Sequence, residues 1–268
     1  MSLEEIPRRT TRRVRPPNPR PERKAKLLSV KAGDKRVAIL QSSYIPWKGY
    51  FDIINSVDEF ILYDDVQFTR RDWRNRNRIK TPQGLRWLTI PVQSKGLYLQ
   101  RVDETLVSDP DWARSHWSAL VQNYSAAPHF AAYRAKFEEL FLTSADTRLS
   151  SINRRFIEAV GEVLGISTPL TWSSEYPASG NKTQRLVSIC AAAGATAYLS
   201  GPSAREYIED AQFQEAGIEL SYADYSGYPE YSQLYPPFEH GVTILDLIFN
   251  AGDRAADYMK SFSSVRSS

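Results

Sequence analysis

Residues 37–90 read VAILQSSYIPWKGYFDIINSVDEFILYDDVQFTRRDWRNRNRIKTPQGLRWLTI, and this stretch predicts the centre of the fold. It contains two short apolar runs, residues 37–40 and 59–63, of the kind that buried strands need. The first run ends at Gln41, and the second ends at the acidic pair Asp64 and Asp65. Because ligands of open α/β sheets bind beyond the carboxyl ends of the strands, we expect the active face at these two strand ends.

After this stretch, the spacing of apolar residues changes from that of strands to that of helices. Residues 109–165 carry three helical patterns, which predict a central helical layer or subdomain. Elsewhere, short apolar runs alternate with helical patterns: strands are expected at 85–92, 168–172, 196–199 and 218–222, and helices at 50–57, 183–193, from 203 onward and at 242–249. This alternation predicts an α/β fold with a Rossmann-like, mostly parallel sheet.

Charge is distributed unevenly along the chain. Residues 1–36 hold 12 Lys and Arg against 4 Asp and Glu, a net charge of +8, whereas residues 37–268 hold 22 against 27, a net charge of −5. We therefore expect a disordered basic Pro/Arg-rich tail at 1–36, a folded domain at 37–252 and a C-terminal tail at 253–268. Since the excess positive charge belongs to the tail, the overall charge does not indicate nucleic acid as a partner of the folded domain.

The cysteine count and the length of the hydrophobic runs indicate the cellular compartment of the protein. A single cysteine excludes an internal disulfide and favours reducing surroundings. No run approaches the roughly 18 apolar residues of a membrane span. These two features predict a cytoplasmic protein without a membrane span.

The segment after the first strand has the composition of a binding loop. Residues 41–51 combine hydroxyls, aromatic rings, a proline, a lysine and a glycine, and they resemble the phosphate-binding turn of HIGH-type nucleotidylyltransferases with both histidines replaced by aromatic residues. The alternative is that the aromatic rings only pack the loop on the sheet. We expect substrate-binding roles for five residues of the loop: Gln41, Tyr44, Trp47, Lys48 and Tyr50.

A dense polar cluster follows the second strand. Residues 70–80 contain five arginines, a lysine, two asparagines and a tryptophan. The alternative interpretation is a solvated charged face, but arginine also recognises carboxylate and phosphate groups through two parallel hydrogen bonds. We therefore expect four further substrate-binding residues here: Trp73, Arg76, Asn77 and Arg78.

A third candidate binding element lies at residues 196–207, which predict a strand, a glycine turn and the start of a helix. Free backbone N–H groups at such a helix start bind anions, which makes Ser200 and Gly201 candidate binding residues. Ser203 as an ordinary helix cap is the alternative.

Three residues are candidates for catalysis. His116 lies on a predicted helical face beside Trp112, either as a general base or as a core histidine. Cys190 lies in an apolar helix, as a structural residue or as a nucleophile. Asp65, with Asp64, could position a metal-bound nucleotide, although adjacent carboxylates in a strand point to opposite faces. No metal site is predicted.

Over residues 37–252 the sequence resembles the WbqC-like family of bacterial proteins. The residues that carry the resemblance are Gln41, Tyr44, 46–47, 49–51, 64–68, Trp73, 76–79, 87–88, 90–92, Trp112, His116, Tyr124, 198–201, Tyr207, Phe238 and 244–250. Where such families often read Gln-Pro, this chain has Gln41-Ser42. The resemblance implies a transferase of surface-polysaccharide or natural-product biosynthesis.

The first functional hypothesis is acyl or aminoacyl transfer to an amine, with amide formation. The alternatives are a glycosyl- or nucleotidyl-transferase that uses a nucleotide-sugar, and a non-catalytic protein that binds or assembles sugar nucleotides. No bound cofactor is predicted, and the donor is an acyl thioester or a nucleotide-sugar. The expected partners are a small-molecule substrate and, as an open alternative, a carrier protein that delivers it.

Overall fold

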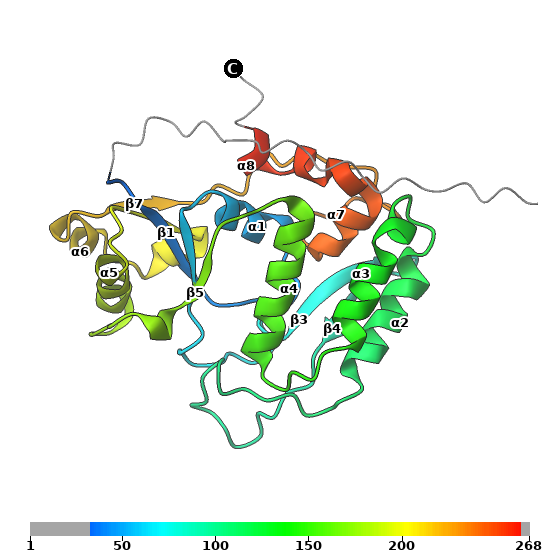
Figure 1. The fold of residues 1–268 in the computed structure, drawn as a ribbon, viewed down its shortest axis with the longest axis horizontal. Coiled ribbons are helices and arrows are strands. Elements are labelled where there is room, and N and C mark those ends of the chain that lie inside the picture. The colour runs from blue at the N-terminus through cyan, green and yellow to red at the C-terminus, as the bar shows by residue number, and fades with distance from the viewer. Residues whose placement is uncertain (1–32, 264–268) are drawn as a thin grey trace, which may run out of the picture.

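The computed structural model describes residues 33–263 and contains a five-stranded parallel sheet (Figure 1). The strand order is β5-β2-β1-β6-β7. These strands are β1 (Arg36–Leu40), β2 (Glu59–Leu62), β5 (Leu170–Trp172), β6 (Ala197–Ser200) and β7 (Glu219–Tyr222). The predicted α/β class and the mostly parallel, Rossmann-like sheet are confirmed. The tail predicted at 1–36 lies outside the described residues except for its last four, and Arg36 begins β1.

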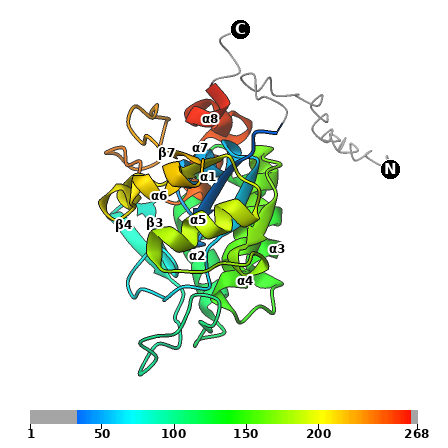
Figure 2. The same cartoon turned by 90° about the vertical axis from the view of Figure 1, so that its left-hand side faces the viewer.

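Helices cover both faces of the parallel sheet. Side chains alternate along β1, so that Val37 and Ile39 pack on one side while Ala38 packs on the other. The first side is covered by α5 (Lys182–Ala192) and α6 (Asp210–Glu215), which lie in front of the sheet in Figure 2. The second side is covered by α1 (Lys48–Asn55) and by the helical segment, whose side chains share one core with it.

The expected central helical segment is present as three helices, α2 (Trp112–Tyr124), α3 (Phe130–Leu142) and α4 (Leu149–Leu164). Their aromatic side chains pack together in the core. Trp117 stacks on Phe130 and Phe141, and Phe141 meets Phe156 of α4 edge-on at 4.7 Å between ring centroids. Gly165 ends α4 in the left-handed conformation that favours glycine.

The polar cluster forms a second, antiparallel sheet, which the sequence analysis did not predict. It consists of β3 (Arg76–Thr81) and β4 (Gly84–Thr89), joined by a short turn beside α2 (Figure 1). The strand predicted at 85–92 is therefore β4, which ends at Thr89 and belongs to this hairpin rather than to the parallel sheet. Arg76 and Arg78 lie on one side of the ladder, and Asn77 and Ile79 lie on the other.

Two further expectations are corrected. The segment after β6 is a five-residue 3-10 helix, η2 (Pro202–Glu206), and not the α-helix expected from residue 203. Residues 253–263 do not form a tail, because α7 (Ile244–Ala251) continues into the 3-10 helix η3 (Gly252–Tyr258) and α8 (Lys260–Ser263), and residues 264–268 lie outside the described residues. Met259 is fully buried, and the backbone N–H of Lys260 donates to Asp52 of α1. A short 3-10 turn, η1 (Ser173–Glu175), follows β5. Within residues 33–263, every helix is too short or too polar to cross a membrane.

Candidate functional site

A cavity of about 750 Å³ opens at the carboxyl ends of β1 and β6. Gln41 follows β1, Tyr63 follows β2, and Ser200 and Gly201 stand at the end of β6, and all four residues line this cavity. The sequence predicts that these strand ends share one cleft, and the cavity confirms that arrangement. Parallel strands gather their carboxyl ends at one edge of the sheet, which explains the convergence.

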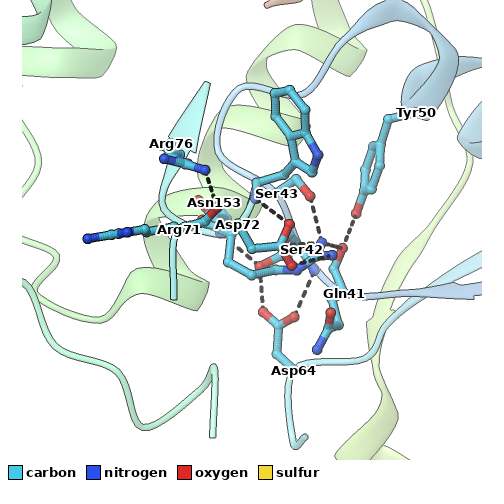
Figure 3. A network of polar contacts seen from close by, with 11 residues as sticks. Gln41, Ser42, Ser43, Tyr50, Asp64, Arg71, Asp72, Arg76 and Asn153 are labelled. Carbon is cyan, nitrogen blue, oxygen red and sulfur yellow. Dashed lines mark hydrogen bonds and ion pairs between the residues drawn. The ribbon is translucent and has the colours of Figure 1, made fainter. Parts of the chain in front are cut away.

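The turn after β1 is held by a buried polar network (Figure 3). Asp64 accepts hydrogen bonds from the Ser42 backbone N–H at 2.7 Å and from the Ser42 hydroxyl at 2.6 Å. Asn153 of α4 donates to the same hydroxyl at 2.9 Å. Burial raises the pKa of Asp64 above its ordinary value, while the bonds from Ser42 oppose that shift. Both carboxylate oxygens of Asp64 therefore bond to Ser42 and fix the loop that borders the cavity.

Arg74 holds the same turn from the cavity side. Its guanidinium lies 2.8 Å from the Ser43 hydroxyl and 3.3 Å from the Gln41 carbonyl, to both of which it donates. The Tyr50 hydroxyl also donates to the Gln41 carbonyl at 3.0 Å. Among residues 33–263, no hydrogen-bond partner is recorded for the Gln41 side-chain amide, which extends away from the network in Figure 3. That amide is therefore open to a ligand in the cavity.

The cavity wall is cationic. It contains Arg74, Arg78 and Lys182, and none of the residues that line it is an aspartate or glutamate. The Arg78 guanidinium donates to the carbonyl of Gly241 at 3.0 Å, and a Cβ at Gly241 would collide with it. Arg74 pairs with Asp72 at 3.5 Å, whereas Arg78 and Lys182 form no ion pair among residues 33–263. Unpaired cations in a concave site attract and hold anionic groups.

Aromatic rings supply the rest of the wall. Trp47 meets Tyr225 edge-on at 4.8 Å between ring centroids, and both rings line the cavity. Gly49 is required beneath Trp47, because a Cβ there would collide with the indole ring. Burial raises the pKa of Tyr225 to about 12, so that its hydroxyl stays protonated at neutral pH. The wall thus combines flat apolar surfaces with hydrogen-bond donors.

The structure brings most of the predicted binding residues to this cavity. Those that line it are Gln41, Trp47, Tyr50, Trp73, Asn77, Arg78, Ser200 and Gly201. Asn77 has a structural role as well, since its amide donates to the backbone carbonyls of Tyr44 and Ile45. The helix whose start was expected to bind an anion after β6 is a five-residue 3-10 segment and not an α-helix.

Three predicted binding residues lie off the cavity wall: Tyr44, Lys48 and Arg76. Tyr44 is fully buried in the core. Lys48 is buried, donates to the Pro229 carbonyl at 3.1 Å and lies 4.8 Å from the centre of the Tyr228 ring. Burial lowers the pKa of Lys48 to about 8. Its ammonium group contacts protein groups and does not line the cavity, and the lowered pKa shows that burial disfavours its charge despite these contacts.

His116 lies in the core rather than in a groove that opens on the cavity. Its side chain is 7% exposed, and neither His116 nor its neighbour Trp112 lines the cavity. Its Nδ1 lies 2.8 Å from the Tyr44 hydroxyl and its Nε2 lies 3.2 Å from the Thr89 carbonyl. This pairing fits a neutral ring that donates from Nε2 and accepts at Nδ1. Burial lowers the pKa of His116 to about 4.

The other two catalytic candidates are also engaged by protein groups. Asp65 forms an ion pair with Arg185 of α5 and accepts a hydrogen bond from Ser173 at 2.6 Å. Cys190 is fully buried, and burial raises the pKa of its thiol to about 12, which keeps it out of the thiolate form. Among residues 33–263, no group of three or more His, Cys, Asp and Glu side chains is placed to hold a metal ion.

His240 lines the cavity, although it was not among the residues predicted to bind or to catalyse. Its ring lines the cavity and packs edge-on against Phe238 at 4.6 Å between ring centroids. Its Nδ1 is buried without a hydrogen-bond partner among the described residues. Burial lowers the pKa of His240, and the charge of nearby Lys48 lowers it further. A neutral imidazole at the wall of a cationic cavity is a candidate proton acceptor.

Further lining residues with polar side chains were not predicted as site residues. Those with a charged or a tyrosine side chain are Tyr63, Arg74, Lys182, Tyr198, Tyr207 and Tyr225. Arg74 lies inside the polar cluster at residues 70–80, so the composition of that cluster could have indicated Arg74 as a binding residue. Tyr225 and His240 belong to a Tyr- and Pro-rich segment without regular structure, in which no periodicity indicates which side chains face inward.

Comparisons with known proteins identify the family of the chain. The sequence model of the WbqC-like protein family matches residues 41–258. The protein named "Uncharacterized protein Rv1507c" from Mycobacterium tuberculosis is 53% identical over 226 residues, which cover 84% of this chain and 98% of that protein. No solved structure matches the chain significantly.

Proposed function

The chain belongs to the WbqC-like protein family, and from that premise we propose that it is a small-molecule transferase of surface-polysaccharide or natural-product biosynthesis that forms amide bonds. The observation that supports this proposal is the cavity itself. Its wall holds three cations and no carboxylate, together with a histidine whose pKa is lowered. An anionic donor and an amine acceptor need these two properties in one site.

The donor in this proposal is an acyl or aminoacyl thioester. Arg78 and Lys182 bind its anionic groups, and the flat faces of Trp47 and Tyr225 pack against its apolar part. The open amide of Gln41 provides a donor and an acceptor that fix the orientation of the acyl group. A cavity of about 750 Å³ has the size of a small-molecule site.

His240 removes the proton of the amine in this mechanism. The amine nitrogen attacks the thioester carbonyl, the C–N bond forms, and the C–S bond breaks as the electron pair leaves with sulfur. The proton lost by nitrogen passes to the imidazole and then to the departing thiolate. A base must be neutral before it accepts a proton, and the lowered pKa of His240 keeps it neutral at pH 7.

A nucleotide-sugar transferase is the second candidate function. The same cationic and aromatic wall fits the phosphates and the base of a nucleotide-sugar. One feature expected for this candidate is the positioning of a metal-bound nucleotide by Asp64 and Asp65. The structure does not support that feature, because both carboxylates are bonded to protein groups. The third hypothesis is a protein that binds the donor without turnover, and the same experiment distinguishes it from both transferases.

The test is a reaction panel followed by mass spectrometry. The purified protein is incubated with acyl-coenzyme A thioesters and amino sugars, and with nucleotide-sugars and the same acceptors. We expect thiol release and an amide product that are lost when Arg78 is changed to Met, whereas Arg134→Met, on exposed α3, leaves both unchanged. Release of a nucleoside diphosphate instead favours the second candidate. Binding of a donor without any product contradicts both transferase proposals.

A further inference from the structure

The β3–β4 hairpin carries a surface beside the cavity, and of its residues the proposed mechanism uses only Arg78. We call it the Trp–Arg face, and it consists of Trp73, Arg76, Arg78 and Trp87. Arg78 and Trp87 stand directly opposite each other in the ladder, and Arg76 is two residues from Arg78 on the same side. Trp73 precedes β3, and its ring lies 5.3 Å from the Trp87 ring between centroids, at an angle of 45°.

Cations and indole rings alternate on this face. The Arg76 guanidinium lies 4.1 Å from the centre of the Trp87 ring, and that of Arg78 lies 5.6 Å from the Trp73 ring and 5.7 Å from the Trp87 ring. Both indoles are 41% exposed, which is a large fraction for tryptophan side chains. The guanidinium groups therefore hold the rings in place and leave part of each ring open to solvent.

The arginines of the face lack acidic partners. Among residues 33–263, neither Arg76 nor Arg78 forms an ion pair. Elsewhere, arginines with a structural role meet carboxylates: Arg185 pairs with Asp65, and Arg101 pairs with Asp103. Residues 37–268 have a net charge of −5, so two uncompensated arginines beside exposed indoles are a local concentration of positive charge. An anionic ligand complements that charge.

The face continues into the cavity. Trp73 and Arg78 line the cavity and also belong to the face, whereas Arg76 and Trp87 lie outside it. A ligand whose reactive end is in the cavity can therefore extend across Trp73 toward Trp87. The chain's own residues 1–32 are an unsuitable occupant, because they hold 10 Lys and Arg against 3 Glu, a net charge of +7.

We propose that the Trp–Arg face binds the nucleoside diphosphate end of the donor. The base stacks on the exposed indole of Trp87 or Trp73, as bases do on aromatic side chains, and Arg76 and Arg78 bind the two phosphates. This inference rests on the proposed transferase function and specifies its donor. Both candidate donors contain the required group, since coenzyme A thioesters carry an adenosine diphosphate and nucleotide-sugars carry a nucleoside diphosphate.

Equilibrium binding of ADP, UDP, coenzyme A and inorganic pyrophosphate to the full chain tests the proposal. Tryptophan fluorescence and calorimetry report binding. We expect ADP to bind more tightly than pyrophosphate, because only ADP has a base to stack. Trp87→Leu should weaken ADP binding by about five- to 100-fold, the usual size of one base-on-aromatic stack, and should leave pyrophosphate binding nearly unchanged. Arg76→Gln should weaken both.

Arg86→Gln is the matched control, because Arg86 is exposed on β4 but pairs with Ile79 on the opposite side of the ladder. It should bind all four probes like the original chain. Circular dichroism confirms folding, and the exposure of Trp87 makes Trp87→Leu a mild change. Tighter binding of coenzyme A than of UDP identifies a thioester donor, and the reverse order identifies a nucleotide-sugar.

Two results overturn the inference. One is the absence of binding by ADP, UDP and coenzyme A at millimolar concentration. The other is nucleotide binding that both Trp87→Leu and Arg76→Gln leave intact. These outcomes differ from failure of the proposed function, in which nucleotides bind to the Trp–Arg face but no donor is turned over.

Discussion

Two histidines occupy opposite kinds of surroundings in this protein. His116 is 7% exposed, and both of its ring nitrogens have protein partners, the Tyr44 hydroxyl and the Thr89 carbonyl. His240 is partly exposed, lines the cavity and has a buried Nδ1 without a partner among residues 33–263. Burial lowers the pKa of both. A neutral imidazole is thus common to both sites, and only the cavity histidine has access to a substrate.

This difference shows which property distinguishes a structural histidine from a histidine that could act as a base. A low pKa alone does not identify a base, because the same desolvation acts on a core residue and on a cavity residue. The distinction lies in the free hydrogen-bonding capacity of the ring and in its access to the ligand space. By that criterion His116 connects the loop after β1 to the hairpin, and His240 is available for proton transfer.

The strongest test of this comparison is His240→Gln. If His240 is the base, the rate of transfer should fall by roughly 10²–10⁴-fold, the usual contribution of a general base, while the fold stays intact. The measurement is the turnover number with the donor and acceptor found in the reaction panel. Binding of the donor should change little, because glutamine keeps a polar side chain at the cavity wall.

His129→Gln is the matched control, since His129 lies outside the cavity lining. It should retain the full rate. His116→Gln should also retain most of the rate while losing stability. If His240→Gln keeps full turnover and His116→Gln loses it, then His116 is the base, His240 is structural, and the assignment made here is wrong.

The second prediction concerns stability and pH. The pKa of His116 is about 4 in the folded protein, against an ordinary value of 6.5, so the unfolded chain takes up the proton first. Its contribution to stability is therefore complete above pH 6.5 and is lost as the pH falls toward 4. A shift of this size corresponds to roughly 3 kcal/mol of unfolding free energy. Urea unfolding between pH 4 and 7 measures it.

The comparison with His116→Gln isolates this contribution. Burial raises the pKa of Asp64 and of Asp246, and raised carboxyl pKa values change stability in the opposite direction over acidic pH. Those groups remain in the variant, so the difference in slope between the two proteins belongs to His116. Equal slopes in both proteins would show that His116 is not held neutral by the core.

Sequence reasoning succeeded where the information is local. The apolar runs at 37–40 and 59–63 indicate buried strands, and the rule about carboxyl ends then places Gln41 beside Ser200 although 159 positions separate them. The helical segment was also predictable, because its hydrophobic period extends over many residues.

The features that were not predicted correctly from the sequence depend on long-range packing. Lys48 looks like an anion binder in sequence, but Tyr228 and the Pro229 carbonyl, about 180 positions later, hold its ammonium group. His116 looks like a base until Tyr44 and Thr89 are found at its two nitrogens. The hairpin was missed because charged residues such as Arg76 and Arg78 have no apolar alternation, and the ladder with β4 places them on one side.

The smallest predicted effect tests what keeps His240 neutral. Glu230 and Glu239 raise the pKa of His240, whereas burial and the charge of Lys48 lower it. Lys48→Met removes that positive charge and retains a long apolar side chain within the aromatic cage around it. Because a nearby cation disfavours the imidazolium, its loss should raise the pKa of His240.

Nuclear magnetic resonance titration of the imidazole Cε1–H signals measures this shift without any substrate. The His240 signal is assigned by its loss in His240→Gln. Lys136→Met, on exposed α3, is the control and should leave the titration unchanged. Burial is the largest cause of the lowered pKa of His240, and it remains in Lys48→Met. An unchanged or lower pKa in Lys48→Met would show that the caged ammonium does not act on His240, and that desolvation alone keeps the ring neutral.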